Sequence, residues 1–242
     1  MTAVDPRRAL SFGAFAEEYQ RWRPGYPPDA VDWLVPPRAT RVADVGAGTG
    51  KLTGSLLQRG LVVDAVEPDP AMLAVLRRGH PDAVPHQASA DALPLSEHSV
   101  DAILVADAWH WFPHAAAMDE VCRVLRPGGW LGLVWNTPAP VEPWEFELVG
   151  IDPDHHGGSE LSAPGLPSAP EETAYFPWTW EVTPDQWCAY LATNSAVAAM
   201  EPAERKQHLD RAHAVVARVC ETTKRPTAPV RHQAFCVRWR PS

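Results

Sequence analysis

The sequence has few cysteines, no long apolar run and no excess of positive charge, and each of these absences excludes a class of protein. No two of its four cysteines have the C-x-x-C spacing of zinc and redox sites: Cys122, Cys188, Cys220 and Cys236. We therefore expect reduced thiols with structural roles and no metal site. The longest apolar runs, such as Leu131 to Trp135, are far too short to cross a bilayer, and the first ten residues lack an apolar signal core. These absences predict a cytoplasmic protein.

The charge balance is acidic, with 21 Lys and Arg against 30 Asp and Glu among 242 residues, so the formal net charge is −9. Nucleic acids and anionic membranes attract a basic surface, so we expect neither as a partner. The 45% hydrophobic content is ordinary for a globular protein and allows one large domain. The 11 tryptophans are unusual and predict large aromatic surfaces, in the core or around an apolar ligand cavity.

Short apolar segments alternate with helix-like segments between Arg41 and Asn136. Continuous apolar strands are typical of parallel strands that are covered on both faces. The repeated strand–helix order therefore predicts an α/β fold with a Rossmann-like, doubly wound sheet. Pro85 confines its strand to an edge or a bulge, because proline cannot donate a ladder hydrogen bond. We expect strands at residues 41–45, 61–66, 83–87, 100–106 and 130–135, and helices at 51–59, 70–78 and 113–125.

The chain after Asn136 is less regular. Many prolines fall between Thr137 and Ala174, which predicts a long loop with one short helix near residues 144–149. The adjacent His155 and His156 have the look of a metal pair, but their Gly/Pro-rich surroundings favour a plain loop. Beyond the loop we expect strands at residues 175–182 and 230–239 and helices at 184–192 and 202–222.

A glycine-rich turn, D-V-G-A-G-T-G at residues 44–50, lies between the first expected strand and the first expected helix. Open α/β sheets bind nucleotide-like ligands at this place, and glycine lets such a ligand approach the backbone closely. The dinucleotide pattern G-x-G-x-x-G fails because residue 51 is lysine. The phosphate-loop pattern fails as well, since it needs glycine in place of Val45 and a hydroxyl in place of Leu52.

Two acids follow the turn at the ends of later strands. Glu67 ends the second expected strand, where a carboxylate can accept both hydroxyls of a ribose. Asp91 follows the third expected strand and lies within reach of an adenine amino group at the same edge. The order of glycine turn, ribose acid and adenine acid predicts an adenosine-containing cofactor.

At these residues the chain resembles the class I S-adenosylmethionine-dependent methyltransferases. Residues 44–50 match their D-x-G-x-G-x-G turn, Glu67 matches their ribose acid, and Asp91 with Ala92 matches their adenine-side pair; residues 126–129 match the turn before their fifth strand. Residues 15–19, 23–27 and 110–112 are similar to the branch that acts on small molecules, such as the ubiquinone/menaquinone and trans-aconitate methyltransferases.

The resemblance implies a sheet of about seven mostly parallel strands whose last strand is antiparallel. It also implies that Asp44 and the backbone of Gly46, with Gly48 and Gly50, hold S-adenosyl-L-methionine. Tyr19 would cover the methionine end of this cofactor, and Met72 would contact the adenine face. By the same resemblance, residues 1–36 form an N-terminal helical lid and residues 37–242 form the methyltransferase domain, with its core at 40–136 and a variable, substrate-side part at 137–242.

His110 is the obvious titratable candidate near the expected reaction centre, because it follows the fourth expected strand. A histidine near neutral pKa can accept a proton from the acceptor, although a structural histidine in the turn explains the same residue. The leading hypothesis is methyl transfer to a small, apolar or aromatic molecule. A non-catalytic regulatory protein that binds the same cofactor is the alternative, and an NAD-dependent oxidoreductase conflicts with Lys51.

Overall fold

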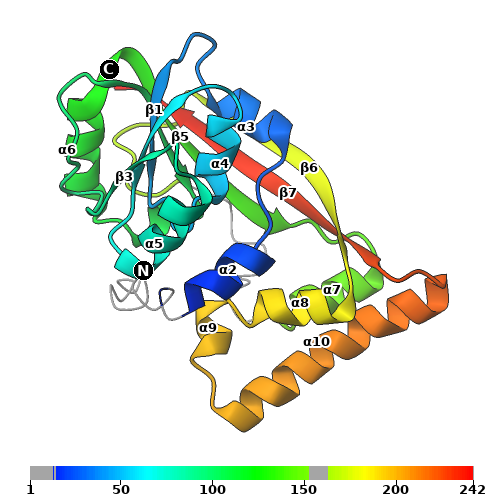
Figure 1. Ribbon diagram of the computed structural model, residues 1–242. Coiled ribbons are helices and arrows are strands. Elements are labelled where there is room, and N and C mark those ends of the chain that lie inside the picture. Colours follow the sequence, from blue (N-terminus) through cyan, green and yellow to red (C-terminus); the bar gives the residue numbers. More distant parts are fainter. Residues whose placement is uncertain (1–12, 14, 153–162, 242) are drawn as a thin grey trace.

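The computed structural model describes residue 13, residues 15–152 and residues 163–241, and its centre is one seven-stranded sheet (Figure 1). The strand order is β3-β2-β1-β4-β5-β7-β6. Neighbouring strands run parallel, except that β7 is antiparallel to both β5 and β6. The predicted α/β sheet with an antiparallel last strand is therefore confirmed. The strands are β1 (Arg41–Val45), β2 (Val62–Val66), β3 (Val84–His86), β4 (Val100–Ala106), β5 (Leu125–Pro138), β6 (Glu172–Val182) and β7 (Ala228–Trp239).

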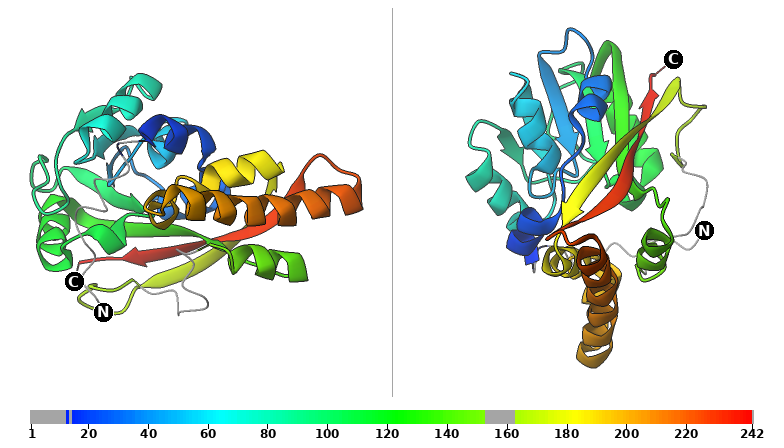
Figure 2. Two further views of the ribbon diagram at one scale, coloured as in Figure 1. Left: turned by 90° about the horizontal axis from the view of Figure 1, so that it is seen from below. Right: turned by 90° about the vertical axis from the view of Figure 1, so that its right-hand side faces the viewer.

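Helices cover both faces of the sheet, as the apolar strands predict (Figures 1 and 2). On one face α3 (Pro28–Leu34) and α4 (Lys51–Leu57) bury apolar side chains against β1, β4 and β5. On the other face α6 (His114–Val124) packs against β4 and β5. The central strands are thus buried on both sides, and only the ends of the strands are open to a ligand.

Local sequence sets the boundaries of several elements. Asp69 caps α5 (Pro70–Gly79), because its carboxylate accepts hydrogen bonds from the backbone N–H groups of Ala71 and Met72. Pro70 occupies the first helical position, where its missing N–H costs nothing. The strand that contains Pro85 lies at the edge of the sheet, as expected.

Three strands, β5, β6 and β7, are longer than the sequence predicts. β5 begins at Leu125, directly after α6, and extends to Pro138, beyond the expected 130–135. Leu125 pairs with Val100 of β4, and the added residues 136–138 pair with β7, where Pro138 lies opposite His232. Long-range pairing therefore keeps the chain extended where local patterns favour a turn or loop. The central part of the expected loop, with His155 and His156, lies outside the described residues.

The C-terminal helices form a second apolar cluster beyond the main sheet (Figure 2). α7 (Pro143–Val149), α8 (Pro184–Leu191) and α10 (Pro202–Thr223) pack around the ends of β6 and β7, while the short α9 (Ser195–Ala198) joins α8 to α10. The N-terminal helix α2 (Ala16–Trp22) contacts both α5 and α8. It therefore connects the glycine-turn side of the sheet with the C-terminal helices.

Candidate functional site

The glycine turn leaves β1 at the carboxyl edge of the sheet and enters α4. Its three glycines have left-handed backbone conformations, with φ of 71° at Gly46, 56° at Gly48 and 93° at Gly50. Such angles are strained for other residues, so glycine is required here. The backbone N–H groups of Gly46 and Ala47 donate to the Val66 carbonyl oxygen at 2.9 and 3.0 Å, which ties the turn to the end of β2.

Glu67 connects the turn to the start of α5. One carboxylate oxygen accepts the backbone N–H of Gly48 at 2.8 Å, and the other accepts that of Asp69 at 2.8 Å. Burial raises the pKa of Glu67 to about 7, although both backbone donors act in the opposite direction. The structure thus places Glu67 beside the glycine turn, as the resemblance implies.

Asp44 is fully buried at the end of β1, below the turn. Its Oδ2 accepts the hydroxyl of Thr53 at 2.6 Å, whereas its Oδ1 is buried and has no hydrogen-bond partner among the described residues. Burial raises the pKa of Asp44 to about 6. An unpartnered buried carboxylate oxygen is costly, so this atom is suited to a ligand that donates a hydrogen bond.

A pocket opens above these residues, between the glycine turn, the N-terminal segment and the end of β4. Its lining residues are Tyr19, Tyr26, Asp44, Gly46, Ala47, Gly48, Thr49, Lys51, Leu52 and Ala106. Gly46 and Gly50 are packed against Ala108 and His80, whereas Gly48 has no atom nearer than 3.5 Å to the place of a Cβ. Asp44 lines the same pocket as Gly48. The residues present therefore fit an aminoacyl-nucleoside cofactor of the expected kind.

The N-terminal segment closes this pocket from outside the sheet. The Lys51 ammonium donates to the Gln20 carbonyl oxygen at 2.5 Å, and the Thr49 hydroxyl donates to the Gln20 side chain at 2.7 Å. The guanidinium carbon of Arg23 lies 5.0 Å from the ring centroid of Tyr19 and 5.2 Å from that of Tyr190. Residues 19–23 thus contact both the glycine turn and α8.

The residues predicted on the adenine side differ in their distance from the glycine turn. Asp91 and Ala92 are both exposed on the loop after β3, and the Ala92 N–H donates to the Ser89 carbonyl oxygen at 3.2 Å. Met72 is buried on α5, and a Cβ added at Gly48 would lie 3.5 Å from its terminal methyl carbon. The structure brings Met72 next to the turn, while no contact in the described residues joins Asp91 to it.

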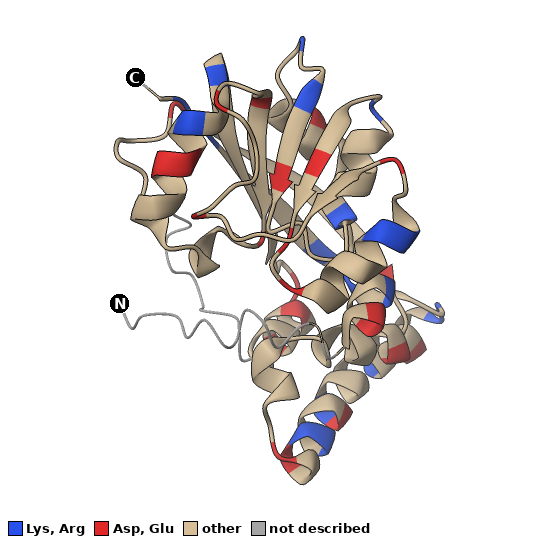
Figure 3. Ribbon diagram, turned by 60° about the vertical axis from the view of Figure 1, so that its left-hand side comes forward, with Lys and Arg blue, Asp and Glu red and all other residues tan. Residues whose placement is uncertain are grey.

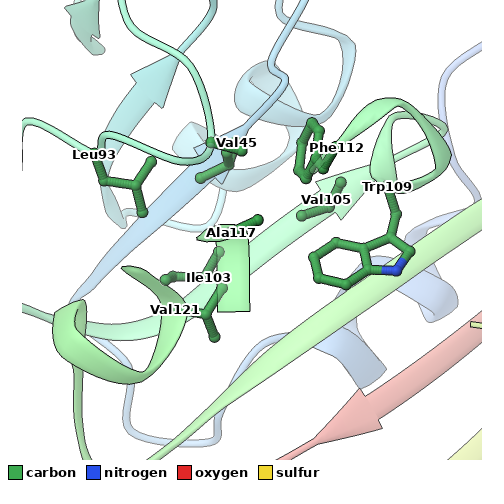
Figure 4. A pocket seen from close by; sticks show the side chains of 9 residues that line it. Val45, Leu93, Ile103, Val105, Trp109, Phe112, Ala117 and Val121 are labelled. Atoms are coloured by element: carbon green, nitrogen blue, oxygen red, sulfur yellow. The ribbon is translucent and has the colours of Figure 1, made fainter. Parts of the chain in front are cut away.

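The candidate base His110 lies on the short 3₁₀ helix η2 (Trp109–Trp111), and its side chain is exposed. Its ring centroid is 4.8 Å from that of Trp111. Trp109 points the other way, into a small apolar pocket between the sheet and α6 that Leu93, Val105 and Phe112 also line (Figure 4). Trp109 is therefore a core residue, whereas His110 faces outward.

Asp107 is a site residue that the sequence analysis did not select, whereas its partner Tyr26 belongs to residues 23–27 of the resemblance. Asp107 directly follows β4, and its Oδ2 accepts the Tyr26 hydroxyl at 2.8 Å. Burial raises the pKa of Asp107 to about 6. One signal was present in the sequence, because an acid immediately after a continuous apolar strand lies at the carboxyl edge of a parallel sheet.

Several further features of the described part of the chain bear on the earlier expectations. All four cysteines are free. Within the described ranges, no group of three or more His, Cys, Asp or Glu side chains is arranged to hold a metal ion. Among the same residues, no helix is both long and apolar enough to span a membrane. Acidic and basic residues are interspersed over the sheet and along α10 (Figure 3).

Comparisons with known proteins show the family to which the chain belongs. Residues 43–133 match the family model described as a methyltransferase domain. An uncharacterised methyltransferase of Mycobacterium tuberculosis is 44% identical over 220 residues, which cover 90% of each chain. A solved structure from Anaeromyxobacter dehalogenans, assigned as a type II methyltransferase, is 26% identical with a TM-score of 0.68 and covers 90% of this chain and 97% of its own. The chain therefore belongs to the class I S-adenosylmethionine-dependent methyltransferases.

Proposed function

We propose that the enzyme transfers the methyl group of S-adenosylmethionine to a small, apolar or aromatic molecule. The observation that carries this proposal is a continuous series of aromatic rings, which begins at the pocket above the glycine turn and ends in the C-terminal cluster. Arg23 joins Tyr19 of the pocket to Tyr190 of α8. The Tyr190 ring centroid is in turn 5.3 Å from that of Trp180 and 5.1 Å from that of Trp187.

The series continues to β7 and β6. The His232 ring lies 4.8 Å from that of Trp178, in a stacked arrangement, and 6.3 Å from that of Trp187. Trp187 is 3% exposed, and the indole N–H groups of Trp178 and Trp187 are buried without a hydrogen-bond partner among the described residues. Burial lowers the pKa of His232 to about 4, so this ring is neutral near pH 7. Trp187 and His232 are thus core residues that support the half-buried rings of Trp180 and Tyr190. Those two uncharged rings are suited to contact with a flat apolar molecule.

The cofactor half of the site is built from the residues described above. We infer that Asp44 and the Gly46 backbone hold the methionine part and that Glu67, beside Gly48, holds the ribose. Met72 would contact the adenine, with Asp91 and Ala92 at its outer edge, and Tyr19 would cover the methionine end. When bound, the cofactor supplies an electrophilic methyl group, so the protein needs mainly to position the acceptor and exclude water.

The acceptor is proposed to be a small molecule rather than a nucleic acid or a membrane lipid. The net charge of −9 opposes binding to a polyanion, and the acids at the site add to this. Asp44 and Lys51 line the pocket. Glu67 and Asp107 lie next to it, because they accept hydrogen bonds from its lining residues Gly48 and Tyr26, and Arg23 lies near Asp107. This balance favours a neutral acceptor over an anionic one.

Two measurements test the proposal. Mass spectrometry of the purified protein should detect S-adenosylmethionine or S-adenosylhomocysteine, and calorimetry should show saturable binding of both. Incubation with S-adenosylmethionine and a panel of phenols, arylamines and aliphatic acids should then give methylated products from the aromatic members. Binding of the cofactor without turnover of any member would instead support the regulatory alternative, and turnover of the aliphatic acids alone would contradict the proposed acceptor class.

A further inference from the structure

Tyr26 and Asp107 form a hydrogen-bonded pair for which the cofactor site gives no role. Tyr26 lies between α2 and α3, and its side chain lines the pocket with Asp44 and Gly46. Its hydroxyl donates to Asp107 Oδ2 at 2.8 Å across 81 residues of sequence. Because Tyr26 lines the pocket and its hydroxyl donates to Asp107, the pair connects the pocket to a half-buried acid.

The backbone holds the Asp107 carboxylate in place. Asp107 has φ of 51°, a left-handed conformation that is strained for a non-glycine residue. The Asp107 N–H donates to the Val134 carbonyl oxygen at 2.9 Å, and Asp107 Oδ1 accepts the Asn136 N–H at 3.2 Å. These two hydrogen bonds to β5 fix both the backbone and the side chain of Asp107. Since a carboxylate can accept about four hydrogen bonds, capacity remains beyond the two that it accepts.

Charged and titratable groups face this pair from four elements. Arg23 and Tyr19 face Asp107 from α2, and Tyr190 faces it from α8. Asp44 of β1 faces Tyr26, and Asp152, which follows α7, faces Arg23. Arg23 opposes protonation of Asp107, whereas burial favours it.

The protonation states of the two residues follow from these surroundings. The pKa of Asp107 is raised to about 6, so its carboxylate is ionised near pH 7 yet more basic than an ordinary aspartate. The pKa of Tyr26 is raised well above its usual value by burial and by Asp107, so its hydroxyl stays protonated. Tyr26 therefore has a free lone pair for a donor in the pocket while its own proton points to Asp107.

The geometry points to Tyr26 and Asp107 as a proton relay for the methyl acceptor, whose reacting group is then an aromatic hydroxyl. As this hydroxyl is methylated, its O–H bond breaks and its proton binds Tyr26 Oη. At the same time the Tyr26 O–H bond breaks, and that proton binds Asp107 Oδ2. Tyr26 ends neutral as it began, and Asp107 later releases the proton to solvent. This inference rests on the proposed function.

A hydroxyl fits this relay better than an alkylammonium group does. The ammonium form is the dominant state of an alkylamine near pH 7, and its nitrogen has no lone pair with which to attack a methyl group. A neutral phenol brings no charge, and its ring matches the aromatic surface around Tyr190.

The first experiment measures where the proton lies on a bound probe. 4-Nitrophenol is titrated in the presence of saturating S-adenosylhomocysteine, and its absorbance reports its ionisation. Next to an ionised Asp107 the bound phenol should resist ionisation. We therefore expect the pH at which half of the bound phenol is ionised to be lower by at least ~1 pH unit in Asp107→Asn than in the wild type. Asparagine tolerates the left-handed backbone, so this variant should fold, and its affinity for S-adenosylhomocysteine checks that it does.

The second experiment measures turnover with two probes. 4-Methylphenol must lose a proton at pH 8, whereas 4-nitrothiophenol is already ionised. We expect Tyr26→Phe and Asp107→Asn each to lower kcat for 4-methylphenol by ~100-fold or more, and kcat for the thiophenol by less than ~3-fold. The double variant should be no slower than the singles, because the two residues act as one unit. Asp101→Asn, which removes a carboxylate from the other end of β4, is the matched control and should keep the wild-type ratio of the two rates.

The outcomes separate the relay from the proposed function. Equal losses with both probes, or an unchanged midpoint in Asp107→Asn, would overturn the relay and leave the aromatic acceptor in place. Failure of the wild-type enzyme to bind or methylate either probe would overturn the aromatic acceptor itself, and the relay with it.

Discussion

At the scale of single residues, Glu67 has both a structural role and a proposed role in ligand binding. Its two carboxylate oxygens each accept a backbone N–H, one from the glycine turn and one from the start of α5. We also assign it to the ribose of the cofactor. Removing the side chain therefore loosens the turn and removes a ligand contact together, whereas the isosteric glutamine keeps one acceptor, but loses the charge and places its amide donor opposite the other backbone N–H.

We expect Glu67→Ala to weaken the binding of S-adenosylmethionine by ~1–3 kcal/mol, the range for losing hydrogen bonds to a charged group. Titration calorimetry measures this loss directly. Glu67→Gln serves as the comparison, and its loss should be smaller. Equal dissociation constants for the alanine variant and the wild type would remove Glu67 from the binding site.

The variant His110→Ala distinguishes between a catalytic and a structural role for this histidine. A general base would make the variant ~10²–10⁴-fold slower in kcat and would remove an acidic limb from the pH–rate profile. The His110 side chain is exposed and lies against Trp111, so we expect instead a lower melting temperature with kcat retained. Differential scanning calorimetry and a kcat measurement on the folded variant decide between them.

At the scale of elements, α2 is the connection between the glycine turn and the C-terminal helices. Its Gln20 accepts hydrogen bonds from Thr49 and Lys51. Arg23, which follows the helix, donates to the Thr193 hydroxyl at 2.9 Å and to Asn194 Oδ1 at 2.6 Å. A ligand that contacts the turn should therefore also stabilise α2 and the segment after α8.

Hydrogen exchange with and without S-adenosylhomocysteine tests this expectation. The amides of residues 15–27 should be better protected in the complex, because a lid must open to admit the ligand. The amides of residues 193–194 should also be better protected, because Arg23 donates hydrogen bonds to both residues. Equal protection in both states would mean that the N-terminal segment is fixed structure, and Tyr19 would lose its proposed role as a cover.

The helix α7 is fixed to β7 by one buried carboxylate. Glu145, 2% exposed, accepts the N–H groups of Val141, Glu142 and Arg231 and also the Arg231 guanidinium at 2.7 Å. We expect Glu145→Ala to lower the free energy of unfolding by ~2–3 kcal/mol, measured by urea denaturation. Glu147→Ala is the matched control on the same helix, and it should cost well under ~1 kcal/mol because its ion pair with Arg218 is exposed.

The pH dependence of the Glu145 contribution has a defined sign. Its hydrogen bonds lower the pKa of Glu145 below the usual value, despite burial. The contribution is therefore present above the unfolded-state pKa and is lost as the pH falls through the folded-state pKa. An unfolding free energy of Glu145→Ala equal to that of the wild type at pH 7 would show that α7 is held by its apolar contacts alone.

At the scale of the whole molecule, the carboxyl groups of the site lower the free energy of unfolding near neutral pH. The pKa values of Asp44, Glu67 and Asp107 are raised to about 6, 7 and 6. A carboxyl group whose pKa is raised by folding stabilises the protein below its unfolded-state pKa, and this contribution is lost as the pH rises through the folded-state value. Each of the three therefore opposes folding near neutral pH.

We expect the wild-type protein to gain unfolding free energy between pH 8 and pH 6, as these groups take up protons. Glu67→Gln lacks the group with the highest raised pKa, so its gain over the same interval should be smaller. Urea denaturation at the two pH values measures both. The same gain in variant and wild type would show that Glu67 does not bind protons more tightly in the folded state.

Much of the architecture follows from short stretches of sequence. The glycine turn at residues 44–50 requires left-handed angles, and its position after an apolar strand places it at the carboxyl edge of the sheet. Asp69 and Pro70 begin α5 by themselves, and Pro85 confines β3 to the edge. Each of these features depends on residues within one or two turns of chain, which is why it could be predicted.

Other features depend on contacts between distant parts of the chain. Arg23 binds residues about 170 positions later, Tyr26 binds an acid 81 positions later, and β5 extends because β7 pairs with it. No local periodicity encodes these contacts, since they form only after the sheet has brought α2, β4 and α8 together. The sequence by itself determined the sheet, the turn and the cofactor class. Only the tertiary structure decided which side chains line the pocket beside the turn, because burial and hydrogen bonding at the edge depend on elements far apart in the chain.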